Sequence, residues 1–258
     1  MTAPVLFVSH GSPELALATE HPWAKALGDY GRSLPARAIL AISAHWWTHE
    51  LKITAAPHPG VLHDFSGFQE ALYALNYPAP GDPALAASIA ATLESSGFTI
   101  SQDLARPLDH GAWAVLRHLR PGADLPVIQL SLPRWEPARL LELGQALAPL
   151  REAGIAILAS GGLVHNLGRL AWNEQGDQSL PWALEAETWA LNAIRNRDTE
   201  ALLAHRTRWP HSMEAAPTTE HLDPIFVALG ATKGETPRDL FRGFQLGSLS
   251  LASLEWNG

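Results

Sequence analysis

Three histidines of this chain each follow an apolar run, and their spacing is the sequence's strongest chemical signal. His10, His45 and His165 come directly or within a few residues after VLFVS, AILAIS and IAILAS. Such runs are typical of buried parallel strands, whose carboxyl ends meet at one edge of a sheet. His221 is predicted in the first turn of a helix, and helix N-termini face the same edge. Since imidazoles bind iron, zinc, copper and nickel, the four histidines together predict a metal site.

For each histidine alone there is a plainer interpretation, which is a hydrogen bond to a loop carbonyl. His110 is predicted to begin a helix, where it either packs and caps or acts as an acid or base, because histidine titrates near neutrality. His63 either pairs with Asp64, lines a pocket or is an ordinary loop residue. The remaining histidines are predicted at the surface or in loops: His21, His49, His58, His118, His205 and His211.

Aromatic residues are also numerous, with 10 tryptophans and 12 histidines in 258 residues. Such a number fits either a large core or an aromatic-lined pocket. Trp46 and Phe65 are candidates for contact with a substrate, together with Trp47 and Trp113, and the core is an equal alternative for each of them.

Alternating strands and helices must position these residues. The predicted strands are 5–8, 38–43, 51–55, 98–100, 125–132 and 155–160, with one or two more in 244–254. The predicted helices are 22–32, 68–75, 83–96, 110–119, 137–152, most of 181–205, and a helix capped by Thr218 or Thr219 that ends near Leu229. Apolar strands separated by helices predict an α/β fold, a three-layer α/β/α sandwich around a mainly parallel, mixed sheet. No repeat or linker divides the sequence, so residues 1–258 are expected to form a single domain.

Composition excludes several classes of function. Lys and Arg total 18 against 26 Asp and Glu, giving a formal charge of −8 and no basic stripe for nucleic acid. There is no cysteine, which rules out disulfides and thiolate metal sites. No signal peptide and no membrane-length apolar run are evident, so we expect a cytoplasmic protein without a membrane partner. The sequence leaves open whether the chain forms a homo-oligomer.

Other catalytic motifs are missing from the sequence. It contains no GxxxxGK[ST], no GxGxxG, no GxSxG nucleophile elbow and no HExxH. No segment proposes a Ser–His–Asp triad. The histidine pattern is therefore the feature to explain.

The chain resembles the class III extradiol ring-cleavage dioxygenases of the 4,5-DOPA dioxygenase type. The matching segments occur in order along nearly the whole chain, and together they are highly specific. They are SHGSP (9–13), SAHW (43–46), HDFSGF (63–68), LY (72–73), YPAPG (77–81), DHG (109–111), QLS (129–131), ASGGLVHNL (159–167), EH (220–221) and GSLS (247–250).

This resemblance implies an oxidoreductase that opens the ring of a small catechol with O2. It implies that His10, His45 and His221 bind the metal. His165 would be the catalytic base, or a further metal ligand in a zinc-loaded resting form. His110 would be a second acid or base. Fe(II) is the metal expected for activity, and Zn(II) is the alternative occupant in the purified or crystal form.

One departure from the better-known members of the class concerns the third ligand. Those enzymes bind iron through two histidines and a carboxylate, whereas His221 stands here with Glu220 beside it. Three neutral imidazoles also describe a catalytic zinc site. The alternative function is therefore a zinc-dependent hydrolase on the same scaffold. A tetrapyrrole metal chelatase would match only the first dozen residues, and a non-catalytic binding module would be expected to lack a ligand.

Overall fold

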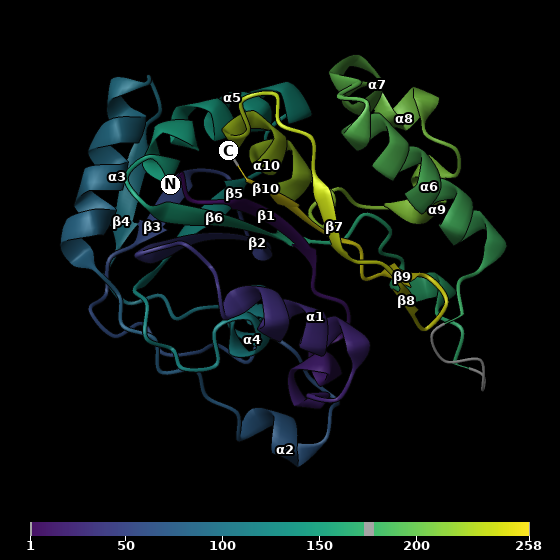
Figure 1. Ribbon diagram of the computed structural model, residues 1–258, viewed down its shortest axis with the longest axis horizontal. Helices are drawn as coiled ribbons and strands as arrows, with labels where there is room; N and C mark the ends of the chain where they lie inside the picture. The colour runs from purple at the N-terminus through teal and green to yellow at the C-terminus, as the bar shows by residue number, and fades with distance from the viewer. Residues whose placement is uncertain (1, 173–177, 258) are drawn as a thin grey trace.

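A mixed sheet of eight strands forms the middle layer of the computed structural model, which describes residues 2–172 and 178–257 (Figure 1). Its strands are β1 (Val5–Ser9), β2 (Ala38–Thr48), β3 (Leu51–Thr54), β4 (Ile100–Asp103), β5 (Val127–Pro133), β6 (Ile155–Gly161), β7 (Arg238–Phe241) and β10 (Ser253–Trp256). They lie in the order β4-β3-β5-β2-β6-β1-β10-β7. The four central strands β5, β2, β6 and β1 are mutually parallel, so their carboxyl ends share one edge.

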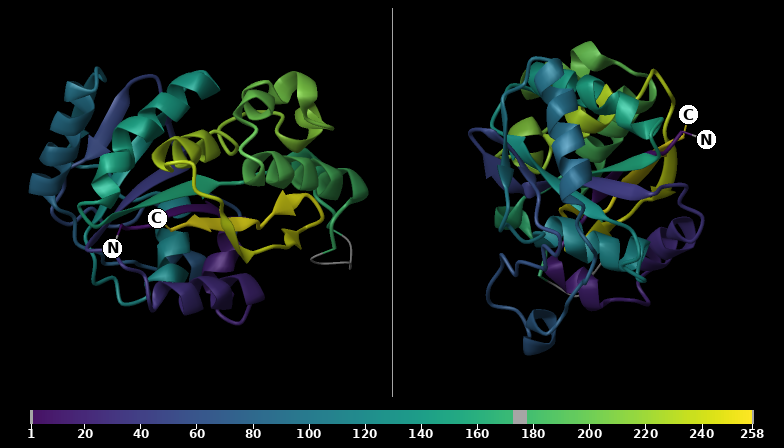
Figure 2. Two further views of the ribbon diagram at one scale, coloured as in Figure 1. Left: turned by 45° about the horizontal axis from the view of Figure 1, so that its top comes forward. Right: turned by 90° about the vertical axis from the view of Figure 1, so that its left-hand side faces the viewer.

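Helices cover both faces of this sheet (Figures 1 and 2). One face carries α1 (Pro22–Gly31), α2 (Glu70–Tyr73) and α4 (His110–Leu119). The other carries α3 (Pro83–Ser95), α5 (Pro137–Leu147) and α10 (Pro224–Ala231). Beyond the β7 edge lie α6 (Pro181–Arg195), α7 (Thr199–Leu203), α8 (His205–Arg208) and α9 (Ser212–Ala215), with the short pair β8 (Phe244–Gln245) and β9 (Leu249–Ser250) nearby.

Successive side chains of the central strands point to opposite faces of the sheet, which gives a hydrophobic core on each face. In β1, Val5 and Phe7 are packed with the α3, α5 and α10 face, whereas Leu6 and Val8 are packed with the α1 and α4 face. All five residues of β1 are buried, as expected for a strand covered on both sides. The predicted three-layer α/β/α sandwich is confirmed.

Some predicted boundaries were wrong for identifiable reasons. The second strand does not end at Ser43. It continues to Thr48 through an irregular stretch, after which Trp47 and Thr48 pair again with β5. The last large helix begins at Pro224, preceded by a turn in which Thr219 Oγ1 bonds the Asp223 carboxylate and does not cap a helix.

Shorter elements also differ from expectation. The helix predicted at 68–75 is only the single turn α2, and the strand predicted at 98–100 lies at 100–103. The helix predicted at 137–152 changes to a 3-10 helix, η2 (Ala148–Arg151), where Pro149 interrupts the α-helical bonding.

Two histidines predicted at the surface are buried. His118 is 7% exposed and its Nε2 lies 2.8 Å from the Leu15 carbonyl, while its ring meets the edge of Trp23. His205 is 4% exposed and contacts the rings of Trp209 and Phe226. Both predictions were wrong because each histidine lies on the face of its helix that packs against the core. Among the described helices, none combines the length and apolarity required to cross a bilayer.

Candidate active site

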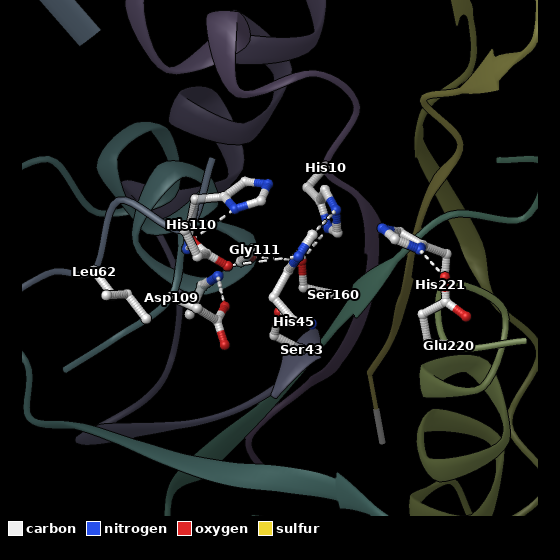
Figure 3. Close-up of polar contacts among 12 residues, drawn as sticks. His10, Ser43, His45, Leu62, Asp109, His110, Gly111, Ser160, Glu220 and His221 are labelled. Atoms are coloured by element: carbon white, nitrogen blue, oxygen red, sulfur yellow. Dashed lines mark hydrogen bonds and ion pairs between the residues drawn. The ribbon is translucent and has the colours of Figure 1, made fainter. Parts of the chain in front are cut away.

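Four histidines from distant parts of the chain converge at the carboxyl edge of the sheet (Figure 3). The ring centroids of His10 and His45 are 4.9 Å apart, those of His10 and His221 are 5.3 Å apart, and those of His45 and His221 are 5.1 Å apart. One nitrogen from each of these three rings lies within 4.8 Å of the others. The fourth, His110, has its ring centroid 3.9 Å from that of His45.

His10 is placed by the end of β1 and oriented by the neighbouring strand β6. Its backbone N–H donates to the Gly161 carbonyl, and its Nδ1 lies 2.9 Å from the Ser160 hydroxyl. That hydroxyl donates its own proton to the Gly111 carbonyl, so it accepts from His10. The hydrogen-bond network therefore assigns the proton of His10 to Nδ1 and leaves a lone pair on Nε2.

His45 lies inside β2, in the irregular stretch where the strand is not paired with β5. Its Nδ1 is 3.5 Å from the Asp64 carboxylate, a neighbour that favours the tautomer with the proton on Nδ1. Its Nε2 is 3.1 Å from Nε2 of His10. Two lone pairs thus face each other, an arrangement that a cation between the two rings would make favourable.

His221 precedes α10, in a turn that packs directly against the end of β6. The Gly162 N–H donates to the His221 carbonyl at 2.7 Å. A Cβ on Gly161 would lie 2.1 Å from the same oxygen, so only glycine permits this approach. The His221 Nδ1 lies 3.2 Å from Glu220, while its Nε2 is buried with no hydrogen-bond partner.

His165 follows β6 and stacks on His221, with ring centroids 3.5 Å apart and planes at 4°. Its backbone N–H donates to the Ala215 carbonyl. The ring lines the same cavity, although His165 is outside the set of three whose ligand atoms lie within 4.8 Å.

His110 begins α4, whose N-cap is the buried Asp109. The Asp64 carboxylate accepts from both the backbone N–H of His110 and its Nδ1, at 3.0 and 2.9 Å. Asp64 therefore holds His110 and faces His45 as well. The sequence suggested Asp64 only as a partner of His63. Its position directly before the aromatic Phe65, a candidate pocket residue, was the feature that could have indicated a role in the site.

Burial dominates the electrostatics of the cluster. It lowers the pKa values of His10 and His221 well below the ordinary value, and the neighbouring histidines lower them further. Burial lowers the pKa of His45 to about 3 and that of His165 to about 4. Burial raises the pKa of Asp64, but its hydrogen bonds with the side chain and backbone of His110 and its interaction with His45 outweigh burial, giving about 2. Neutral imidazoles beside one carboxylate are the protonation states that metal binding requires.

The donors of this cluster fit a bound metal ion. His10 and His45 direct unprotonated Nε2 atoms toward each other, and His221 has an orphaned buried nitrogen. Each metal-facing ring has its other nitrogen near a hydroxyl or carboxylate, the usual support for a histidine ligand. A second set of closely spaced donors, His45 with Asp64 and His110, shares one histidine with the first.

A cavity of about 390 Å³ opens over the cluster, a size typical of small-molecule sites. Among the residues the structure describes, its lining combines five histidines, namely His10, His45, His110, His165 and His221, with apolar side chains: Phe65, Phe68, Leu167, Leu170, Trp172, Leu246 and Leu249. Trp172 is 78% exposed at this cavity and was not anticipated from the sequence.

Phe65, His63 and Trp46, three of the residues considered for a substrate pocket, have different positions. Phe65 lines the cavity. His63 is not among its described lining residues; its Nε2 lies 3.1 Å from the Leu75 carbonyl, and its ring meets Phe65 from behind. Trp46 is also outside the described lining, because it follows His45 in the strand and is buried under the Arg106 guanidinium.

Comparison with known proteins gives the family. Residues 6–251 match the family model described as the catalytic LigB subunit of aromatic ring-opening dioxygenase. The chain belongs to the LigB family. This LigB-family chain is 37% identical to a 4,5-DOPA dioxygenase extradiol of Escherichia coli (strain K12), over 98% of its own length and 94% of that protein. It is 36% identical to a protein of the same name from Beta vulgaris, over 91% and 88% of the two chains.

A solved structure supports the same relationship. The LigB-family chain superimposes on the crystal structure of an uncharacterized protein from Escherichia coli K12 with a TM-score of 0.82 and 29% identity, covering 99% of this chain and all of the other. The protein is thus a metal-dependent extradiol ring-cleaving dioxygenase, an oxidoreductase that acts on a small aromatic substrate and O2. The hydrolase alternative is not favoured.

Proposed function

We propose that this dioxygenase opens the ring of a small catechol, DOPA-like or another dihydroxy-aromatic, with Fe(II) held by His10, His45 and His221. The observation that supports it most is the pair of Nε2 atoms of His10 and His45, 3.1 Å apart, with the Nδ1 of each ring near a hydroxyl or a carboxylate. Iron bound there would bring catechol and O2 to one centre and let electron density pass between them. Zinc would occupy the same imidazoles in a resting form, following its higher affinity.

His165 is proposed as the base that removes a proton from the catechol hydroxyl. Burial holds its pKa at about 4, so the ring is neutral near pH 7 and can accept a proton. Its stacking on His221, a proposed metal ligand, supports this role. We assign it the role of base and not of ligand, because it lies outside the closely spaced set of three.

His110 is proposed as the second acid or base, supported by Asp64. The Asp64 carboxylate accepts from Nδ1 and so directs Nε2 away from itself. Its negative charge would stabilise a proton gained by the His110 ring. In this proposal His165 takes up the proton of the catechol, and His110 returns a proton as the ring opens.

The apolar lining would exclude water and bind the ring of the substrate. We propose Phe65 for this contact, with His63 supporting it from behind and Trp46 supporting the strand of His45. We further propose that residues 1–258 form a single domain, since the site residues come from segments that meet at one edge of a single eight-stranded sheet. We propose the cytoplasm as its location.

The proposed function is tested by oxygen uptake. Protein freed of metal and loaded anaerobically with Fe(II) should consume one O2 per ring-opened product on a panel of catechols. The same protein loaded with Zn(II) should consume none. Absence of oxygen uptake by the iron form on every catechol, or equal activity of the zinc form, would contradict the proposal.

The role of His165 is tested by replacing it with alanine. Loss of a positioned base typically costs 10²–10⁴-fold in rate, or about 3–5 kcal/mol of barrier. We expect His165→Ala to retain its iron and lose turnover by about that factor. Turnover equal to the wild type at full iron content would refute the assignment.

A further inference from the structure

The charged groups at the cavity are all of one sign. Among the described residues that line it, the only charged side chains other than histidines are Glu14 and Asp64, and there is no Lys or Arg. Asp64 is engaged with His110 and His45. Glu14 is therefore the free charge that a bound substrate's side chain would meet.

Glu14 is held at the cavity by the structure around it. It lies in η1 (Pro13–Leu17), the 3-10 turn that follows His10. The Ser12 hydroxyl caps this turn by accepting from the Glu14 N–H, and the Ser12 N–H donates to Gln245 at 2.8 Å. The Glu14 residue is exposed, and in the described part of the chain it makes no ion pair.

Two guanidinium groups near the cavity lining are already engaged, and a third, that of Arg117, donates to the Ala16 carbonyl of η1 outside the described lining. Arg169, beside the lining residues Leu167 and Leu170, pairs with Glu214 at 3.0 Å. Arg106 stacks on Trp46 and lies 3.7 Å from Asp109. The sequence from 166 to 179 contains no cationic residue other than Arg169. A substrate carboxylate would thus find no free cation in this part of the cavity.

We propose that this site selects catechols by the charge of the ring substituent, with Glu14 as the residue that determines specificity. This inference rests on the proposed function. A protonated amine is favoured, an uncharged alkyl group is intermediate, and a carboxylate is disfavoured, because it would be partly desolvated by the apolar lining opposite a negative charge. The formal charge of −8 acts in the same direction at longer range.

The test compares three catechols that differ only in the group at ring position 4: aminoethyl, methyl and carboxymethyl. Rates of O2 uptake by the Fe(II)-loaded enzyme give kcat/KM for each, and tryptophan fluorescence of the Zn(II)-loaded enzyme gives Kd without turnover. We expect the order amine, methyl, carboxylate in both measurements. Glu14→Gln should lower the amine-to-carboxylate ratio about 5-fold, in the range of an exposed charge pair, and Glu14→Lys should reverse the order.

A matched control separates the local charge from the net charge. Glu94→Gln removes one exposed carboxylate from α3, outside the described cavity lining, and should leave the ratio as in the wild type. A carboxylate substrate that ranks first, or a ratio that Glu14→Gln does not change, overturns the inference. If no catechol is cleaved while the order of Kd values holds, the proposed function fails and the charge selection stands.

Discussion

At the residue scale, the site depends on which nitrogen of each histidine carries the proton. Hydrogen bonds to Ser160 and Glu220 assign the Nδ1 protons of His10 and His221, and the Asp64 carboxylate 3.5 Å away favours the same tautomer in His45. Each contact leaves Nε2 available at the centre of the cluster. The proposed metal site therefore consists of three imidazole rings together with the oxygens that orient them.

His221→Ala should remove one of the three proposed ligands. We expect metal binding to fall sharply, with less than one equivalent of iron retained after dialysis and no O2 uptake. His58→Ala, which removes an exposed histidine, should retain full metal content. Elemental analysis of both variants decides the matter, and an iron content in His221→Ala equal to that of the control would show that His221 is no ligand.

Asp64→Asn keeps the shape of the side chain and removes its charge. Loss of a supporting contact of this kind typically costs about 10- to 100-fold in metal affinity or activity. We expect a loss of that size in kcat/KM, because Asp64 orients both His110 and His45. Asp29→Asn, at an exposed position on α1, is the control. Equal kinetics for the two variants would remove Asp64 from the site.

At the scale of elements, close approaches of backbone place the histidines. The turn before α10 reaches the end of β6 only because Gly161 has no side chain, and α4 approaches β2 through Gly111, where a Cβ would lie 2.2 Å from the Ser43 hydroxyl. Both contacts bring a histidine, His221 or His110, to the carboxyl edge of the sheet. The site therefore depends on two glycines that let backbone segments approach closely.

Gly161→Ala should displace the His221 turn, because the new methyl group would collide with a backbone oxygen that has no freedom to rotate away. Overpacking of this kind costs about 1–3 kcal/mol. We expect weaker metal binding along with a lower urea midpoint. Gly122→Ala, whose Cβ would meet nothing closer than 3.5 Å, should change neither. Wild-type metal affinity in Gly161→Ala would contradict the role given to this contact.

At the scale of the whole molecule, apolar periodicity predicted the layers, while individual side-chain partners required coordinates. The runs before His10 and His165 identified central strands, and the position of His10 just past its strand followed directly. The place of His45 within β2 could not be read, because Ser43-Ala44-His45 looks like a strand end and the renewed pairing at Trp47 depends on β5. The sequence also could not show that Asp64, and not His63, faces the histidine cluster. That outcome depends on contacts of Asp64 with His110 and His45, which are distant along the chain.

Buried neutral histidines outside the site should make global stability depend on pH. Burial lowers the pKa of His118 below its ordinary value of 6.5, so the unfolded chain takes up a proton first as the pH falls. The stability contributed by the neutral ring is present above about pH 6.5 and is lost below it, with a slope of at most about 1.4 kcal/mol per pH unit. His118→Gln should give a shallower decline of the urea midpoint between pH 7 and pH 5 in metal-free protein. An unchanged decline would contradict this.

The convergence of three imidazoles on one metal ion is tested most directly by crystals of the zinc-loaded protein measured at the zinc absorption edge. We expect a single anomalous peak per chain, enclosed by the imidazole nitrogens of His10, His45 and His221, with His165 beside it. A peak enclosed instead by His45, Asp64 and His110, or no peak at the carboxyl edge of the sheet, would contradict it.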